Sequence, residues 1–264
     1  MADLQGLIHN VPPVTRFFLI SIVLFTGPVL LQQLSPGSIY LSWPHIRQEW
    51  EVWRLWSSFF FVGGGFPALY DFFLIYRNGS SLEKETFLNR TGEYAWANLM
   101  VACIILVFNI PFNIPFLFRP LLHAQNYLWC RANPTMSISL FGLLNIPVPY
   151  YPIAMIVLDL ILGGPPKGIA GLVGMLAGHT WWFLSTYLPT HPSAKIKRRN
   201  PLQAPRRFLN LFPSGQTDRI YGRGFEAARG RGSTAGGRTS ATSEGRTTSH
   251  NWGRSGQRLG GEPL

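Results

Sequence analysis

Charged residues and cysteines are both scarce in this sequence, and each scarcity excludes a class of protein. Only 12 of the 264 residues are acidic and 23 are basic, whereas 47% are hydrophobic, which excludes a water-soluble enzyme of this size. The two cysteines, Cys103 and Cys130, have no CxxC spacing and no nearby pair of histidines. This excludes a disulfide-bonded secreted scaffold and a zinc site. We expect both cysteines to be small hydrophobic packing residues, and we expect no metal and no cofactor.

The charges that are present are unevenly distributed along the chain. Residues 1–188 contain nine basic and eight acidic residues, whereas residues 189–264 contain fourteen basic and four acidic residues. The second part is rich in Gly, Ser, Thr and Arg and has almost no periodic apolar pattern, so it cannot bury enough surface to offset its ordering entropy. The sequence therefore predicts a membrane domain over residues 1–188 and a disordered basic tail over residues 189–264. A nucleic-acid binder is excluded for the chain as a whole, and we expect no nucleic-acid partner.

Long apolar runs predict membrane-spanning helices, each of which needs about 20 mostly apolar residues. Six segments qualify: Val14–Leu34, Leu55–Tyr76, Tyr94–Phe118, Leu121–Leu144, Val148–Gly163 and Gly168–Leu188. The fourth contains several polar residues before Pro134. The fifth reaches only about 24 Å at about 1.5 Å per residue, and a span this short thins the bilayer around it. We therefore expect an all-α membrane protein built as a six-helix transmembrane bundle.

The basic tail sets the expected orientation of the bundle. With six spans both termini lie on one side of the membrane, and an excess of Lys and Arg marks the cytosolic side. The tail residues that carry this signal are Lys195, Lys197, Arg198, Arg199, Arg206 and Arg207. The glycosylation sequons at Asn78 and Asn89 then lie in a cytosolic loop, and we expect neither to be modified.

Polar residues inside the predicted spans are candidates for function, because polar groups are costly in a bilayer. They are Asn98, Asn109, Asn113, Gln125, Asn126, Arg131, Asn133, Asp159 and His179. Each alone is expected to form an interhelical hydrogen bond, whereas the group predicts a polar, hydrated groove. In the last span, Gly174 and Gly178 form a GxxxG face that permits close approach of another helix. We expect His179, which follows directly, to be a hydrogen-bond partner rather than a base.

The loop between the first two spans is rich in aromatic residues. Tyr40, Trp43, Trp50 and Trp53 occur within the segment Ile39–Arg54. This density of amphipathic aromatic side chains is typical of a segment that rests at the membrane interface.

Taken together these residues resemble the Derlin family, rhomboid-superfamily proteins of the endoplasmic reticulum membrane, over residues 9–190. The motifs that carry the resemblance are, in order, Pro12-Pro13-Val14-Thr15-Arg16, Trp53-Arg54-Leu55-Trp56, Asn89-Arg90-Thr91, Tyr127-Leu128-Trp129, Asn133-Pro134, Pro149-Tyr150-Tyr151-Pro152, and Gly174 with Gly178-His179. The resemblance implies a six-helix rhomboid-like fold and a multi-pass protein of the endoplasmic reticulum membrane with both termini in the cytosol.

The resemblance also implies a pseudoprotease without catalytic residues. Active rhomboid proteases pair a Gly-x-Ser-Gly nucleophile with a histidine in the last helix. Neither Ser137 nor Ser139 has a glycine two residues before it, so the nucleophile motif is missing although His179 is present. The alternative is an intramembrane rhomboid serine protease that uses Ser137 or Ser139 with His179. A third hypothesis, a small-solute channel or transporter, is disfavoured because the sequence has no inverted repeat.

The function that the resemblance implies is endoplasmic-reticulum-associated degradation within protein quality control and the unfolded protein response. Its partners would be misfolded protein clients, a membrane RING-type ubiquitin ligase complex, the valosin-containing AAA ATPase and the lipid bilayer. We expect Trp53 and Arg54 to form the lumenal loop motif. The tail from Trp252 to Gly260 is similar to the ATPase-recruiting motif Trp-Gly-x-Gly-x-x-Leu-Gly, with one extra residue between the glycines. The candidate docking residues are Trp252, Gly253, Gly256 and Leu259.

Overall fold

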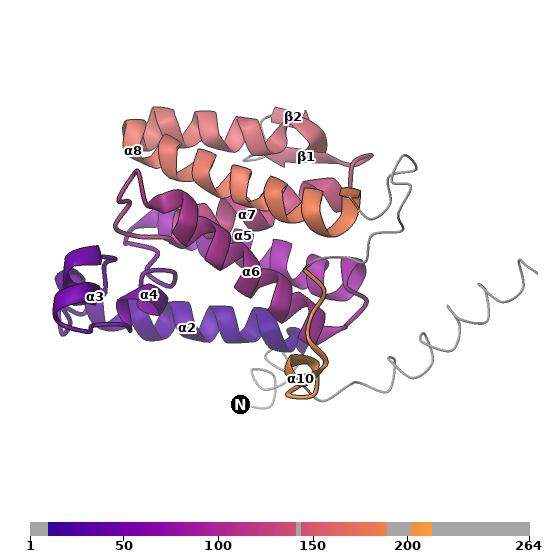
Figure 1. Ribbon diagram of the computed structural model, residues 1–264. Coiled ribbons are helices and arrows are strands. Elements are labelled where there is room, and N and C mark those ends of the chain that lie inside the picture. Colours follow the sequence, from indigo (N-terminus) through magenta and orange to yellow (C-terminus); the bar gives the residue numbers. More distant parts are fainter. Residues whose placement is uncertain (1–9, 141–143, 189–201, 213–264) are drawn as a thin grey trace, which may run out of the picture. The chain divides into compact units, whose positions relative to one another are not determined.

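The computed structural model describes residues 10–140, 144–188 and 202–212, which form a mainly helical bundle (Figure 1). The elements are α2 (Pro13–Leu30), α3 (Trp43–Gln48), α4 (Arg54–Ser57), α5 (Phe66–Ser81), α6 (Thr91–Asn109), α7 (Phe118–Ala132), β1 (Ser137–Leu140), β2 (Leu144–Pro147), α8 (Tyr151–Trp182) and α10 (Arg206–Leu209). Short 3-10 turns cover Pro36–Ser38 and Val148–Tyr150, and π-helical turns cover Leu82–Thr86 and Phe183–Tyr187. The short helices α3 and α4 lie at one end of the bundle and α10 at the other.

The first long helix, α2, begins where a distant carboxylate caps it. Pro13 stands at its start, where the absent N–H costs nothing. The free N–H groups of Val14 and Thr15 donate to the two carboxylate oxygens of Glu83, at 3.1 and 2.9 Å, and the Thr15 hydroxyl donates to the same group at 2.9 Å. Glu83 is fully buried. The start of α2 is thereby held against the turn that follows α5.

The second predicted span, Leu55–Tyr76, is wrong in its bounds. Only Arg54–Ser57 is helical at its beginning, and α5 does not start until Phe66. The chain between them contains Gly63 and Gly65, whose φ angles of 92° and 81° lie in the left-handed region that favours glycine. A run of three glycines therefore breaks an apolar stretch that hydropathy alone reads as one helix.

The fourth predicted span, Leu121–Leu144, is also wrong. Helix α7 begins and ends earlier, at Phe118 and Ala132, and the residues beyond Pro134 form an antiparallel hairpin in which Ile138 lies opposite Ile146. Asn133 leaves the helical region because a residue before proline is driven towards extended backbone. The described residues are thus mostly helical, but the expectation of an all-α protein is corrected by this hairpin.

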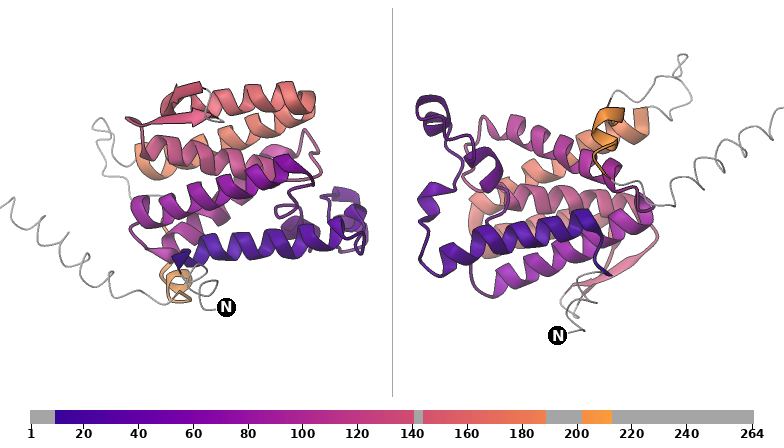
Figure 2. Two further views of the ribbon diagram at one scale, coloured as in Figure 1. Left: turned by 180° about the vertical axis from the view of Figure 1, so that it is seen from behind. Right: turned by 90° about the horizontal axis from the view of Figure 1, so that it is seen from below.

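The predicted fifth and sixth spans are the two arms of α8, which breaks at Gly164. There φ is 74° and ψ is −177°, and Pro165 and Pro166 follow directly. Figure 2 shows the two arms side by side. The first arm begins at Tyr151 rather than Val148. The third span is shorter than the predicted Tyr94–Phe118, because α6 ends at Asn109 before the turn at Asn113, whose φ is 50°.

Three helical stretches of the described residues are long and apolar enough to cross a membrane, namely Pro13–Leu30, Thr91–Asn109 and Val148–Tyr187. They support a membrane protein. Helix α7 has 15 residues, which corresponds to about 22 Å, whereas α5 continues without a break into the π-helical turn Leu82–Thr86. Ten of the fifteen residues of α7 are buried, so this helix packs inside the bundle.

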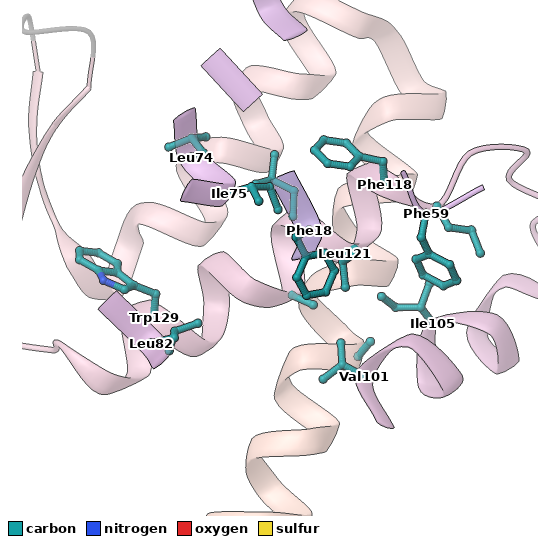
Figure 3. Packing of buried hydrophobic residues seen from close by; sticks show 14 of the residues in the cluster. Phe18, Phe59, Leu74, Ile75, Leu82, Val101, Ile105, Phe118, Leu121 and Trp129 are labelled. Carbon is teal, nitrogen blue, oxygen red and sulfur yellow. The ribbon is translucent and has the colours of Figure 1, made fainter. Parts of the chain in front are cut away.

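The apolar core joins the long helices through large side chains. Phe18 of α2, Ile75 of α5, Val101 and Ile105 of α6 and Leu121 of α7 lie within it (Figure 3). Burial of such side chains contributes about 1.5–3 kcal/mol each, which is the main force that holds the helices together where they contact one another.

Part of the predicted tail packs on the bundle. The indole N–H of Trp96 in α6 donates to the carbonyl oxygen of Leu202 at 2.9 Å, and the Phe208 ring lies 5.1 Å from the Trp96 ring. Residues 202–212 therefore differ from the expectation of disorder from residue 189 onward. The rest of that tail, including Trp252, Gly253, Gly256 and Leu259, lies outside the described residues.

Candidate functional site

A cluster of charged side chains joins α5, α7 and α8 inside the bundle. Arg119 of α7 forms ion pairs with Asp71 of α5, at 2.5 Å, and with Asp159 of α8, to which its Nε donates at 2.8 Å and its Nη2 also donates. The Nε2 atom of His123 lies 2.6 Å from the same Asp159 carboxylate. His123 and Asp159 are each 2% exposed. One partly exposed arginine is therefore shared by two buried carboxylates.

The sequence indicated only part of this cluster. Asp159 is one of the predicted intramembrane polar residues, but no motif predicts a role for the other three members, Asp71, Arg119 and His123. The available signals were an acidic residue, Asp71, within an apolar run, and the spacing of four between Arg119 and His123, which places both on one face of a helix. The rotation of each helix decides which neighbouring helix these side chains contact. No sequence pattern within a single segment specifies that rotation.

Other predicted polar residues form hydrogen bonds within the protein. The amide of Gln125 donates to Asn98 at 2.8 Å, and Asn98 donates to the carbonyl oxygen of Tyr94 at 2.9 Å. Asn126 accepts from Asn78, and Asn109 bonds both the N–H and the carbonyl oxygen of Ile114. The Gln125–Asn98 and Asn78–Asn126 bonds are the interhelical contacts expected of polar residues in a bilayer, whereas Asn98 also bonds within α6 and Asn109 bonds the turn that follows it.

Arg54 organises the loop between α2 and α5. It is 5% exposed, its Nε lies 2.5 Å from the Glu51 carboxylate, and its Nη1 donates to the carbonyl oxygens of Gly37 and Tyr40 at 2.7 and 3.2 Å. The guanidinium group also lies 5.2 Å from the centre of the Tyr40 ring. Trp53 beside it is 54% exposed. The two predicted motif residues thus differ in role, since Arg54 holds the loop together and Trp53 presents an aromatic surface.

The glycines of the last helix face α7. A Cβ atom added to Gly174 would overlap the carbonyl group of Pro120, and one added to Gly178 would lie 2.9 Å from the carbonyl oxygen of Ala124. The second arm of α8 can therefore approach α7 only because these positions lack a side chain. This is the close approach that a GxxxG face permits.

His179 contacts aromatic residues rather than a serine. Its Nδ1 lies 2.6 Å from the hydroxyl oxygen of Tyr127, and its ring lies 5.9 Å from that of Trp182. Ser137 and Ser139 lie on β1, and within the described part of the chain no hydrogen bond joins either serine to His179. In the same part of the chain no three His, Cys, Asp or Glu side chains are grouped to hold a metal ion.

An apolar cavity of about 580 Å³, named here the α2–α6 cavity, lies between these two helices. Its lining includes Phe17 of α2, Trp56 of α4, and Leu99 and Cys103 of α6, all of them exposed. Asn98, which is bonded to Gln125, provides a polar group in its wall.

Comparisons with known proteins identify relatives over most of these elements. A model of the Der1-like family matches residues 11–201. Derlin-1 of Oryza sativa subsp. japonica is 35% identical over 206 residues, which cover 75% of this chain and 80% of the relative. Derlin-1 of Arabidopsis thaliana is 34% identical over 205 residues, covering 75% and 73%. Derlin-1.2 of Zea mays is 32% identical over 203 residues, covering 75% and 79%.

Proposed function

Because the chain belongs to the Der1-like family, as its resemblance to the Derlins predicted, we propose that it acts in endoplasmic-reticulum-associated degradation. In this role it is a non-catalytic component that helps misfolded lumenal or membrane proteins cross to the cytosol. It is a six-span protein of the endoplasmic reticulum membrane with both termini in the cytosol, and α3 and α4 lie on the lumenal side. The observation that carries the proposal is the family match over residues 11–201, which includes α2 to α8.

The α2–α6 cavity and the short first arm of α8 supply a mechanism. A client segment leaving the lumen must cross about 30 Å of hydrocarbon. The first arm of α8, residues 151–163, reaches only about 20 Å, which is shorter than this and favours a locally thinner bilayer. The apolar side chains of the α2–α6 cavity receive hydrophobic parts of the client beside that thinned region. Both features lower the barrier to crossing without any covalent chemistry.

The contact between His179 and Tyr127 supports a non-enzymatic role. A serine protease needs a nucleophile within hydrogen-bond reach of its base. The Nδ1 of His179 is engaged by Tyr127, and Ser137 and Ser139 lie on a β-strand. We expect a fluorophosphonate probe to leave the purified protein unlabelled. Labelling of either serine that His179→Ala abolishes would favour the protease alternative.

A cellular chase experiment tests the main proposal. Cells that lack this chain are complemented with the wild type or with Trp53→Ala. A third strain receives Arg47→Ala, a control at an exposed position of the same loop. We expect a misfolded lumenal client to persist without the protein, and to decay again with the wild type and Arg47→Ala but more slowly with Trp53→Ala. Equal client decay in cells with and without the chain would contradict the proposal.

The partner assignments are tested separately. We propose that Trp252, Gly253, Gly256 and Leu259 dock the valosin-containing AAA ATPase, and that the membrane domain lies beside a RING-type ubiquitin ligase. A glycine-rich sequence that carries two apolar anchor residues is suited to serve as a docking segment. Co-purification of the ATPase with the wild type but not with a Trp252→Ala, Leu259→Ala double variant is the expected result. Retention of the ATPase by the double variant would exclude this motif.

A further inference from the structure

A second cavity, of about 630 Å³, is lined in part by α10 and the residues before it. It is formed by the turn after α5, the start of α6, the ends of α7 and α8, and residues 202–209. Arg131 and Arg90 are the cations of its described lining, so we name it the Arg131 cavity. The proposed degradation function uses none of these residues.

Within the described residues, Arg131 provides this cavity with a positive charge that no carboxylate pairs, because the lining carboxylate Glu93 is paired with Arg90. Its guanidinium group lies 3.8 Å from the centre of the Trp182 ring and 5.7 Å from that of Tyr127. Over residues 10–140, 144–188 and 202–212, no carboxylate forms an ion pair with it, whereas Arg90 is paired with Glu93 at 2.9 Å. Arg131 also hydrogen-bonds the Tyr127 side chain, and an arginine stacked on an aromatic ring keeps its remaining donors available for an oxyanion.

The walls of the Arg131 cavity change from apolar to polar. Trp96, Trp181 and Trp182 line it, and tryptophan gathers where spanning helices meet the membrane–water interface. Leu82 and Leu128 form an apolar part of the wall, and Ser185 adds a hydroxyl group. The volume falls within the range of about 300–1,000 Å³ that is usual for small-molecule sites. A ligand that fits this lining has an anionic head and an apolar body.

We propose that the Arg131 cavity binds the phosphate-bearing headgroup of an anionic phospholipid from the adjacent leaflet. Arg131 binds the phosphate, and the tryptophans contact the glycerol region and the first carbons of the acyl chains. Basic pockets between spanning helices are suited to such headgroups, because the lipid can enter sideways from its own leaflet. A soluble phosphate would gain no energy from the apolar wall.

The test uses the full-length chain purified in neutral detergent. Native mass spectrometry measures the binding of phosphatidylinositol and, in parallel, of phosphatidylcholine with the same acyl chains. We expect the wild type to bind phosphatidylinositol preferentially and Arg131→Gln to bind it at least about tenfold more weakly, because a charge-assisted, bidentate contact is lost. Arg206→Gln removes an exposed arginine of α10 that does not line the cavity, and we expect it to bind as the wild type does.

Equal binding of the two lipids by the wild type would overturn the proposal, and so would unchanged phosphatidylinositol binding by Arg131→Gln. An equal loss of binding in Arg206→Gln would also overturn it, because bulk charge would then be responsible. Competition by glycerol phosphate at the same concentration as the lipid would show a soluble-phosphate site instead. Ser185→Phe retains Arg131 but fills the cavity, and it must also weaken phosphatidylinositol binding. This second variant decides the matter if Arg131→Gln elutes as an aggregate.

Discussion

At the scale of single residues, Arg119 has the largest expected effect on stability. It compensates two buried carboxylates, those of Asp71 and Asp159, and removing one partner of a buried ion pair costs about 3–5 kcal/mol. We expect Arg119→Met to reduce the free energy of unfolding by about this amount. Unfolding in mixed micelles measures it, with Arg47→Met at an exposed loop position as the control. Asp71→Asn in the Arg119→Met background should restore part of the loss, and a variant as stable as the wild type would show that the cluster is dispensable.

Glu83 is the second residue whose substitution has a specific expected result. In Glu83→Ala the N–H groups of Val14 and Thr15 lose their acceptor, and each unsatisfied buried donor costs about 1–3 kcal/mol. We expect faster amide hydrogen exchange at the start of α2, measured by mass spectrometry on the peptide that contains these residues. Glu85→Ala, which removes an exposed neighbouring carboxylate, should leave that exchange unchanged. Equal exchange in both variants would mean that α2 does not depend on this cap.

At the scale of elements, the packing of α8 on α7 depends on the absence of side chains at two glycines. A methyl group at position 174 would overlap the backbone of Pro120, and backbone yields less readily than a flexible side chain. We expect Gly174→Ala to destabilise the protein by about 1–3 kcal/mol, the usual cost of overpacking. Gly27→Ala in α2 is the matched control, because no atom lies within 4 Å of its added Cβ and alanine favours a helix. Thermal unfolding in detergent compares the two, and equal melting temperatures would contradict close α7–α8 packing.

The elements also show what the sequence could predict. Apolar run length located α2 and α6, and the spacing of Gly174 and Gly178 indicated a packing face, because both signals lie within one segment. The prediction of one helix over Leu121–Leu144 was wrong, because hydropathy does not distinguish an apolar strand from an apolar helix. The chain changes from helix to strand after Pro134. The Asp71–Arg119–Asp159 contacts join three separate helices. They depend on how each helix is rotated, which no local pattern contains.

At the scale of the whole molecule, the α2–α6 cavity lies along the first turns of α2, whereas polar contacts hold α2 at both ends. Glu83 binds its start, and the Thr26 hydroxyl near its end donates to the carbonyl oxygen of Phe60 at 3.1 Å. These contacts keep α2 in the bundle, while Phe17 of α2 and Cys103 of α6 form two exposed walls of the cavity. If clients enter through the α2–α6 cavity, linking its two walls must stop them.

This requirement gives a test that uses a native cysteine. Cys103 is exposed and lines the α2–α6 cavity, whereas Cys130 is buried, so a membrane-permeant bismaleimide added to Phe17→Cys should join α2 to α6 selectively. We expect the linked protein to remain folded and to retain its partners while decay of the misfolded client falls to the level of cells without the chain. Phe17→Cys with Cys103→Ala, treated in the same way, cannot be linked across the cavity and should still support client decay. If the linked protein sustains client decay as well as this control does, clients do not pass between α2 and α6, and the route must lie along another face of the bundle.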